Sequence, residues 1–185
     1  MSHIVTLAGS PNPQSRSSYL LRCVEQQLAR LGFTVTRFSI DDFNAEDLIH
    51  ARSGTPAHQA LNAAIARAQG VVIASPVYQG SFTAALKAIL DQIQHRGLNG
   101  KSVLSLSTSG SIAYRQSLEF ALLPVLKTLE TSHILPGINV ADQEFTRAGT
   151  EIESYLTEEV IQRLQDGLDA FLSKLPRNPH EQIAA

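Results

Sequence analysis

The sequence predicts a three-layer α/β/α sandwich built on a five-stranded parallel sheet. Short apolar runs alternate with amphipathic stretches along the chain, as in strands that are joined by crossover helices. The run Val71–Ala74 lies between a helical stretch and a Ser-Pro turn, which is typical of a central strand covered on both faces. Unusual polar residues follow the first, third and fourth expected strands, at the sheet edge where such folds bind ligands.

The first half of the chain has the signals of three strands and three helices. The β-branched residues around Val35 favour extended structure, Gly32 marks the end of the preceding helix, and Pro56 suits a first helical turn. Residues 41–55 have no regular pattern and are expected to be irregular. The expected strands are Ile4–Ala8, Phe33–Ile40 and Val71–Ala74, and the expected helices are Tyr19–Leu31, Pro56–Ala68 and Phe82–Gln94.

The second half continues the alternation and completes the sheet. Pro124 lies inside a helical stretch and should disturb it, because proline removes a backbone donor and crowds the carbonyl four residues earlier. We expect a single domain over residues 1–175 and a polar, flexible tail over residues 176–185. The remaining expected elements are a strand at Lys101–Leu106, a helix at Tyr114–Glu130, a fifth strand from His133–Leu135 with Gly137–Val140, and a helix at Leu156–Leu175.

Charge and composition argue against several classes of partner. The 185 residues carry a formal net charge of −2, so no electrostatic attraction to nucleic acid or to an anionic membrane is expected. No apolar run is long enough to span a bilayer, and the N-terminus lacks the segments of a secretion signal. We therefore expect a cytoplasmic protein.

The single cysteine and the six histidines are expected to be structural or surface residues. One cysteine cannot form an intramolecular disulfide, and Cys23 falls beside apolar residues of the first helix, which favours a buried thiol over a nucleophile. The histidines are scattered without the spacing of a metal site, so no metal is expected.

The loop after the first strand has the composition of a phosphate cradle. Helix N-terminal amides attract an anion, and hydroxyl and guanidinium groups add charge-assisted hydrogen bonds to a phosphate monoester. The loop lacks the spaced glycines of a dinucleotide fingerprint and the Gly-Lys-Ser/Thr of a P-loop, so a terminal monophosphate such as that of FMN fits best. The alternative is a polar turn with Ser17 or Ser18 as the helix N-cap. The cradle residues are Ser10, Ser15, Arg16, Ser17 and Ser18.

Two further loops are expected to meet this cradle at the sheet edge. After the third strand, Pro76 fixes the backbone, Gly80 permits a left-handed conformation, and Tyr78 offers a flat face with a polar tip. This loop suits a planar heterocycle, and small hydrogen-bonding residues after the fourth strand suit the edge of the same ring. Each loop taken alone is also compatible with an ordinary turn. The residues are Pro76, Val77, Tyr78 and Gln79, and Thr108, Ser109, Gly110 and Ser111.

These motifs, in this order, resemble the NADPH-dependent FMN reductases of the flavodoxin-like superfamily. The chain looks most like the reductase components of two-component alkanesulfonate monooxygenase systems. The resemblance implies a flavodoxin-like fold, FMN as the flavin, and NADPH or NADH as the hydride donor. It rests on Leu7–Pro11 with Ser15–Ser18, on Ser75–Tyr78, on Ala85–Asp91 and on Thr108–Ser111, and it extends to about Gly137.

The resemblance also implies roles for the three loops. The serines of the first loop and Arg16 match the family's phosphate loop, the segment Pro76–Gln79 matches the lining of the isoalloxazine ring, and the segment Thr108–Ser111 matches the loop that reaches the pyrimidine side. Hydride passes from the nicotinamide C4 to the flavin N5 in such enzymes, so the chemistry requires no general acid or base from the protein.

The resemblance also implies that two helices take part in subunit contacts. Family members pair subunits at the helix that holds Lys87 and Asp91, which implies a dimer or tetramer with an intersubunit ion pair; the alternative is an i,i+4 pair on a solvated face. In the sulfonate-linked reductases, the fourth helix carries a π-bulge with an aromatic residue, often Tyr, near a partner subunit's flavin. Phe120 stands at that position without a hydroxyl, and an ordinary core aromatic is the alternative.

The expected function is NAD(P)H-dependent reduction of FMN, with reduced FMN supplied to a partner flavin-dependent monooxygenase of sulfonate or sulfur metabolism. A flavin-containing quinone or azo-compound reductase is an alternative, because acceptor choice depends on pocket shape. A flavodoxin-type electron carrier is a second alternative, although such carriers are usually strongly acidic and this chain is nearly neutral.

Overall fold

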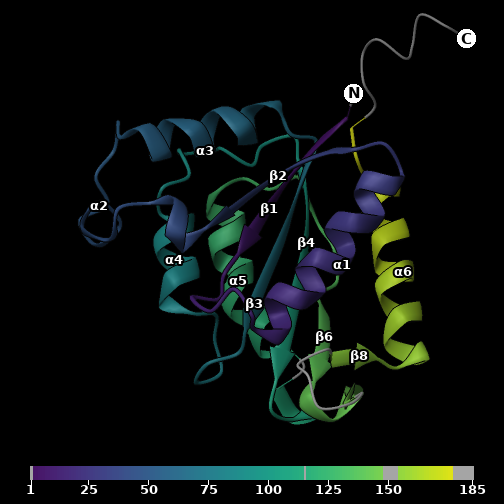
Figure 1. The fold of residues 1–185 in the computed structure, drawn as a ribbon. Coiled ribbons are helices and arrows are strands. Elements are labelled where there is room, and N and C mark those ends of the chain that lie inside the picture. The colour runs from purple at the N-terminus through teal and green to yellow at the C-terminus, as the bar shows by residue number, and fades with distance from the viewer. Residues whose placement is uncertain (1, 115, 148–153, 177–185) are drawn as a thin grey trace, which may run out of the picture.

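A parallel sheet lies between two layers of helices in the computed structural model, which describes residues 2–114, 116–147 and 154–176 (Figure 1). The strands lie in the order β2-β1-β3-β4-β5, and β6 also pairs with β4. This order is flavodoxin-like, so the predicted fold class is confirmed. The strands are β1 (His3–Ala8), β2 (Thr34–Ser39), β3 (Gly70–Pro76), β4 (Ser102–Ser109), β5 (His133–Ile134) and β6 (Ile138–Ala141).

The two helical layers cover opposite faces of the sheet (Figure 1). One face packs against α1 (Arg16–Arg30) and α6 (Glu158–Ser173), and the other against α3 (Pro56–Arg67), α4 (Ala84–Leu90) and α5 (Ser117–Thr128). Because side chains alternate along a strand, the central strands supply both cores. Ile4, Val72 and Leu104 belong to the first core, and Val5, Val71 and Val103 to the second.

The first helix begins three residues earlier than expected. Ser15 is its N-cap, because the Ser15 hydroxyl accepts a hydrogen bond from the backbone amide of Ser18 at 3.2 Å. Ser17 and Ser18 lie within the first turn, so the alternative in which one of them caps the helix is wrong. The loop therefore enters the helix directly at Arg16.

The last position of the sheet holds an interrupted strand. The short strand β5 pairs with the start of β4, and β6 pairs with the end of β4, both in parallel. Pro136 lies between the two pieces and has no amide to donate to a ladder, which accounts for the break. The predicted fifth strand, expected from the two runs His133–Leu135 and Gly137–Val140, is therefore confirmed in place.

Several shorter elements have no expected counterpart. Asn44 caps a helix within the segment expected to be irregular, by accepting from the amides of Glu46 and Asp47. Leu156 belongs to a hairpin strand rather than to the last helix, which Thr157 caps. The additional elements are α2 (Ala45–Ile49), β7 (Phe145–Arg147), β8 (Ser154–Leu156) and the 3-10 turns η1 (Ile40–Asp42), η2 (Ile112–Tyr114) and η3 (Asp142–Glu144).

Other boundaries differ by a few residues. The helix α4 covers only the centre of the expected stretch, because Thr83 caps it and a turn follows Leu90. The helix α5 starts at Ser117 and runs through Pro124 without a break, so the expected disturbance does not end the helix. The tail beyond Pro176 lies outside the described residues. No described helix combines the length and the apolar character that crossing a membrane requires.

The amino-terminal edge of the sheet buries two basic side chains. The Lys101 Nζ donates to the backbone oxygen of Ala68 at 2.8 Å, at the end of α3, and burial lowers the pKa of this amine. The ring of His3 lies 2.8 Å from the Thr36 hydroxyl. Burial lowers the pKa of His3, and the positive charges of Arg67 and Lys101 lower it further. The folded chain therefore favours a neutral imidazole at this edge.

We expect the free energy of unfolding to fall as the pH drops below about 6.5, the usual pKa of histidine. The folded-state pKa of His3 lies below this value, so the unfolded chain binds protons first and the contribution of His3 is lost. Urea denaturation between about pH 7.5 and about pH 5.5 should show a smaller loss for His3→Gln than for the wild type. The exposed His50, changed to Gln, is the control. An equal loss in His3→Gln and the wild type would contradict this expectation.

Candidate functional site

The loops after β1, β3 and β4 lie side by side at the carboxyl edge of the sheet, toward the lower end of the view in Figure 1. Parallel pairing places Ala8 beside Ala74, and Pro76 beside Thr108, so the three loops leave neighbouring strand ends. The sequence-predicted residues of all three loops are thus brought to one edge. Residues that are far apart in the sequence are therefore neighbours in the fold.

The first two loops are joined by hydrogen bonds at Gly9, which lies beside Ala74 of β3. The Gly9 amide donates to the oxygen of Ala74 at 2.7 Å, and the Thr83 hydroxyl donates to the oxygen of Gly9. The same Thr83 accepts from the Leu86 amide as the N-cap of α4. A Cβ on Gly9 would lie 2.8 Å from the Ala74 oxygen and 2.9 Å from the Leu86 Cβ. This Gly9–Thr83 junction therefore requires a residue without a side chain.

The serines of the first loop bond to one another and to the backbone of Asn12. The Ser15 hydroxyl lies 3.1 Å from that of Ser17 and donates to that of Ser18 at 3.0 Å. The Ser18 hydroxyl donates to the oxygen of Asn12 at 3.2 Å, and Ser10 accepts from the Asn12 amide at 3.1 Å. These hydroxyls shape the loop. The first-turn amides of Arg16 and Ser17 have no partner within the helix, so they are the donors available to an anion.

Arg16 is held by a part of the chain in which the sequence shows no strong motif. Its Nη1 lies 2.6 Å from Oδ1 of Asp142, and its guanidinium lies over the Phe145 ring, 5.3 Å from the centroid. The side chains of Arg16 and Asp142 are 39% and 46% exposed. Asp142 and Phe145 come after the last strand of the sheet, so only the fold brings them to the first loop.

A cleft of about 430 Å³ opens between the second and third loops. Tyr78 and Ser81 close the second loop with two backbone hydrogen bonds, of 2.8 and 3.0 Å. Between them, Gln79 and Gly80 have φ angles of 50° and 74°, which confirms the left-handed conformation predicted for Gly80. Tyr114 also lines the cleft, although it was not among the predicted site residues. The lining consists of Val77, Gln79, Gly80, Ser109, Gly110 and Tyr114.

A buried asparagine of the neighbouring strand β6, Asn139, holds the third loop by hydrogen bonds. The Ser109 hydroxyl lies 2.9 Å from the Ser111 oxygen and 3.1 Å from Oδ1 of Asn139. The Asn139 amide donates to the Ser107 hydroxyl at 2.8 Å. The loop is also tied to its neighbour, because the Val77 amide donates to the oxygen of Thr108 at 2.8 Å. Asn139 is thus a positioning residue that the sequence did not reveal.

The residues implied in subunit contacts lie on the surface of this chain. Phe120 is 70% exposed, so the alternative of a core aromatic is wrong. Its amide donates to the Gln116 oxygen at 3.1 Å, which is the α-helical pairing, and the described helix has no π-bulge at this position. Lys87 reaches both carboxylate oxygens of Asp91 at 2.7 Å, so the i,i+4 pair is formed within the chain.

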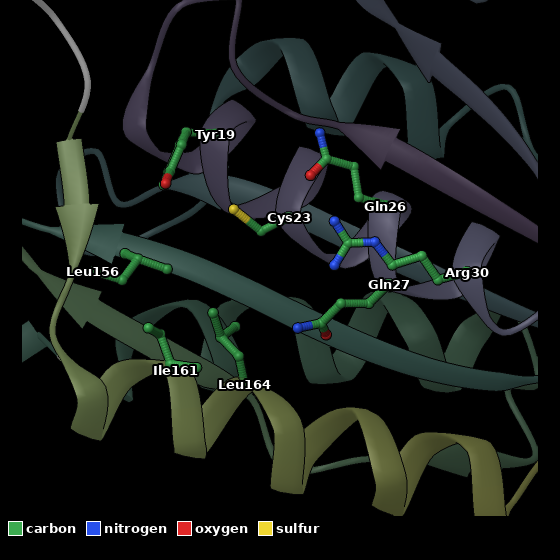
Figure 2. A pocket seen from close by; sticks show the side chains of 8 residues that line it. All are labelled: Tyr19, Cys23, Gln26, Gln27, Arg30, Leu156, Ile161 and Leu164. Carbon is green, nitrogen blue, oxygen red and sulfur yellow. The ribbon is translucent and has the colours of Figure 1, made fainter.

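A second hollow, of about 270 Å³, lies between α1 and α6 and contains none of the predicted site residues (Figure 2). The Cys23 thiol points into it and is half-buried, where a buried thiol was expected. Burial raises the pKa of Cys23, which keeps the thiol protonated and agrees with its not being a nucleophile. Among the described residues, no three His, Cys, Asp or Glu side chains gather as a metal site.

Comparison with known proteins identifies the family. The family model of NADPH-dependent FMN reductases matches residues 2–146, which include all three loops. The chain belongs to this family. It is 39% identical to "FMN reductase (NADPH)" of Pseudomonas putida strain KT2440 over 95% of this chain and 89% of the relative, and 35% identical to "FMN reductase (NADPH)" of Escherichia coli K12 over 94% and 90%.

A solved structure agrees with this assignment. The apo form of NADH:FMN oxidoreductase (EMOB) superposes with a TM-score of 0.85 at 26% identity, over 97% of this chain and 93% of the other. Family membership makes the chain an NAD(P)H:FMN oxidoreductase, with FMN and NADPH or NADH as its redox partners. The resemblance that the three loop motifs suggested is therefore confirmed.

We expect Gly9→Ala to lower the free energy of unfolding by about 1–3 kcal/mol, the usual effect of overpacking. The added methyl would contact the Ala74 oxygen and the Leu86 side chain at less than 3.0 Å, so the Gly9–Thr83 junction has to open. Urea denaturation measures the change. Gly110→Ala is the matched control, since a Cβ there meets nothing within 4 Å. Equal stability of the two variants would show that the junction is not tightly packed.

Proposed function

We propose that the chain binds FMN and the pyridine nucleotide in turn at the three-loop edge and supplies reduced FMN to a flavin-dependent monooxygenase of sulfonate or sulfur metabolism. The observation that carries the proposal is the pairing of two unlike subsites on one edge. Arg16 and the first-turn amides of α1 form the cationic end, and the open cleft beside Val77 and Ser109 forms the other. The two ends match a phosphate and a planar ring system.

The residues at both ends fit FMN. The flavin phosphate would accept from the guanidinium of Arg16 and from the amides of Arg16 and Ser17. The isoalloxazine ring would rest against Val77 and Gln79, with the loop of Ser109 and Gly110 at its polar edge. Contributions of Ser10, Pro76, Tyr78, Thr108 and Ser111 follow from their places in the same loops. Backbone and small side chains provide most of this surface, which suits a flat ligand.

The chain itself contributes alignment rather than proton transfer. FMN, when bound, supplies a hydride acceptor at N5 for the nicotinamide C4. The described lining of the cleft contains no carboxylate and no imidazole. Val77 and the Gln79–Gly80 turn would orient the ring, and the exposed Tyr78 and Tyr114 would border the face on which the nicotinamide stacks. Hydride transfer in such a site depends on the distance between the nicotinamide and isoalloxazine rings and does not require a catalytic acid or base.

The proposal includes assembly into a dimer or tetramer. Phe120 is exposed on α5, and Tyr78 and Tyr114 are exposed beside the cleft, so three large aromatic side chains are available to a second copy. The helix α4, with Lys87 and Asp91, is the other proposed contact. Because the half-exposed pair of Lys87 and Asp91 is satisfied within one chain, an intersubunit pair would have to replace it.

A steady-state assay tests the proposed activity. Pure protein should oxidise NADPH or NADH rapidly only when free FMN is added, and added flavin-dependent alkanesulfonate monooxygenase should then convert its sulfonate substrate. Absence of FMN-dependent oxidation with either nucleotide would overturn the proposal. Rapid oxidation of the nucleotide without any product from the monooxygenase would support the reductase activity and contradict the proposed partner.

We expect Arg16→Ala to weaken FMN binding about tenfold or more, because hydrogen bonds to charged groups contribute about 1.5–3 kcal/mol. Quenching of flavin fluorescence measures the affinity, and riboflavin, which has no phosphate, should bind the variant and the wild type equally. Arg52→Ala is the control, since Arg52 pairs with Glu46 and Asp47 on the surface. Unchanged FMN affinity in Arg16→Ala would remove this residue from the site.

A further inference from the structure

Asp142 is the acidic side chain that pairs with Arg16, the cationic residue of the proposed phosphate subsite. Its Oδ1 lies 2.6 Å from Nη1 of Arg16, which is a short, charge-assisted contact. Asp142 begins the 3-10 turn η3, directly after β6, whereas Arg16 begins α1 directly after the first loop. The pair therefore joins the first loop to the far side of the sheet edge.

A phosphate at the first turn of α1 would meet this pair. It would either displace the carboxylate from Arg16 or share the guanidinium with it, and in both cases Asp142 opposes binding. Displacement breaks an existing ion pair, and sharing places two anions on one cation. The carboxylate of Asp142 is thus a competitor, built into the chain, for the group that would bind the phosphate.

The position of Arg16 does not depend on the carboxylate alone. The guanidinium lies over the ring of Phe145, 5.3 Å from the centroid, and that ring is buried in the core beneath α1 and α6. A cation over an aromatic face is attracted to it without using its N–H donors. Phe145 can therefore hold Arg16 in place, with its donors free, when Asp142 carries no charge.

We propose that Asp142 is a positioning residue that competes with the flavin phosphate for Arg16 and thereby keeps FMN weakly bound and exchangeable. This inference rests on the proposed function, since it concerns the same subsite. A reductase that supplies reduced FMN to another enzyme has to release its flavin, and a carboxylate that competes with the phosphate would favour this release. The competition acts on the phosphate and not on the isoalloxazine ring.

The test compares FMN with riboflavin in Asp142→Asn. The asparagine keeps the size of the side chain and removes its charge, so FMN should bind about three- to tenfold more tightly at low salt, and dissociate more slowly. The gain should shrink at high salt, because the pair is partly exposed. Riboflavin affinity should stay unchanged, and Asp142→Glu should restore weak FMN binding. Fluorescence quenching and stopped-flow dissociation give the two readouts.

Asp169→Asn is the matched control. It removes the same charge from an exposed position in the last turns of α6, which ends beside Ser102 at the opposite edge of the sheet. FMN affinity in this control should equal that of the wild type.

Three outcomes would overturn the inference. FMN affinity that is unchanged or lower in Asp142→Asn would show that the carboxylate does not compete. A parallel gain for riboflavin would place the effect at the ring or in the fold. An equal gain in FMN affinity in Asp169→Asn would show that the effect comes from the net charge of the protein and not from the Arg16–Asp142 pair. A wild-type chain that binds neither flavin would instead overturn the proposed function, and this inference with it.

Discussion

The packing of Gly9 between Ala74 of β3 and the hydroxyl of Thr83 is the contact on which the candidate site depends. Gly9 donates to the oxygen of Ala74 and accepts from the hydroxyl of Thr83, so the first loop is fixed to the second within a few ångströms. No side chain fits there, because the Ala74 oxygen and the Leu86 Cβ occupy the space. Thr83 also caps α4, so the same residue that orders a helix holds the two loops together.

The two edges of the sheet use charge in different ways. At the amino-terminal edge, Lys101 and His3 are buried, and their lowered pKa values reflect the cost of that burial. At the carboxyl edge, Arg16 and Asp142 are partly exposed and remain accessible to a charged ligand. The proposed binding site therefore lies at the edge whose charged side chains are open to solvent, whereas the buried charges of the other edge are part of the fold.

The sequence predicted the architecture because strand and helix signals are local. The apolar run at Val71–Ala74, the glycine at residue 32 and the proline at residue 56 each act on their own neighbours, and β3, α1 and α3 formed close to the expected places. The gap around Pro136 was also expected, whereas the early start of α1 was missed. That start depends on which side chain accepts from the first-turn amides, and such hydrogen-bond partners are less visible in a pattern.

The loops of the candidate site could be predicted from the sequence, but the residues that hold these loops in place could not. Arg16 and the residues around Ser109 could be selected because loops at one edge of a parallel sheet converge. Asp142, Phe145 and Asn139 could not, since their roles come from contacts across about 30 to 130 residues of chain, and nothing in their own surroundings is unusual. The same holds for Phe120, whose exposure depends on how α5 packs.

Hydrogen–deuterium exchange with and without FMN tests most directly whether one flavin spans the three loops. Bound FMN should slow amide exchange together in the peptides that contain residues 9–18, 76–81 and 108–114, and riboflavin should protect the last two more than the first. Protection that is confined to one loop, or that appears instead between α1 and α6, would contradict a single site at the carboxyl edge of the sheet.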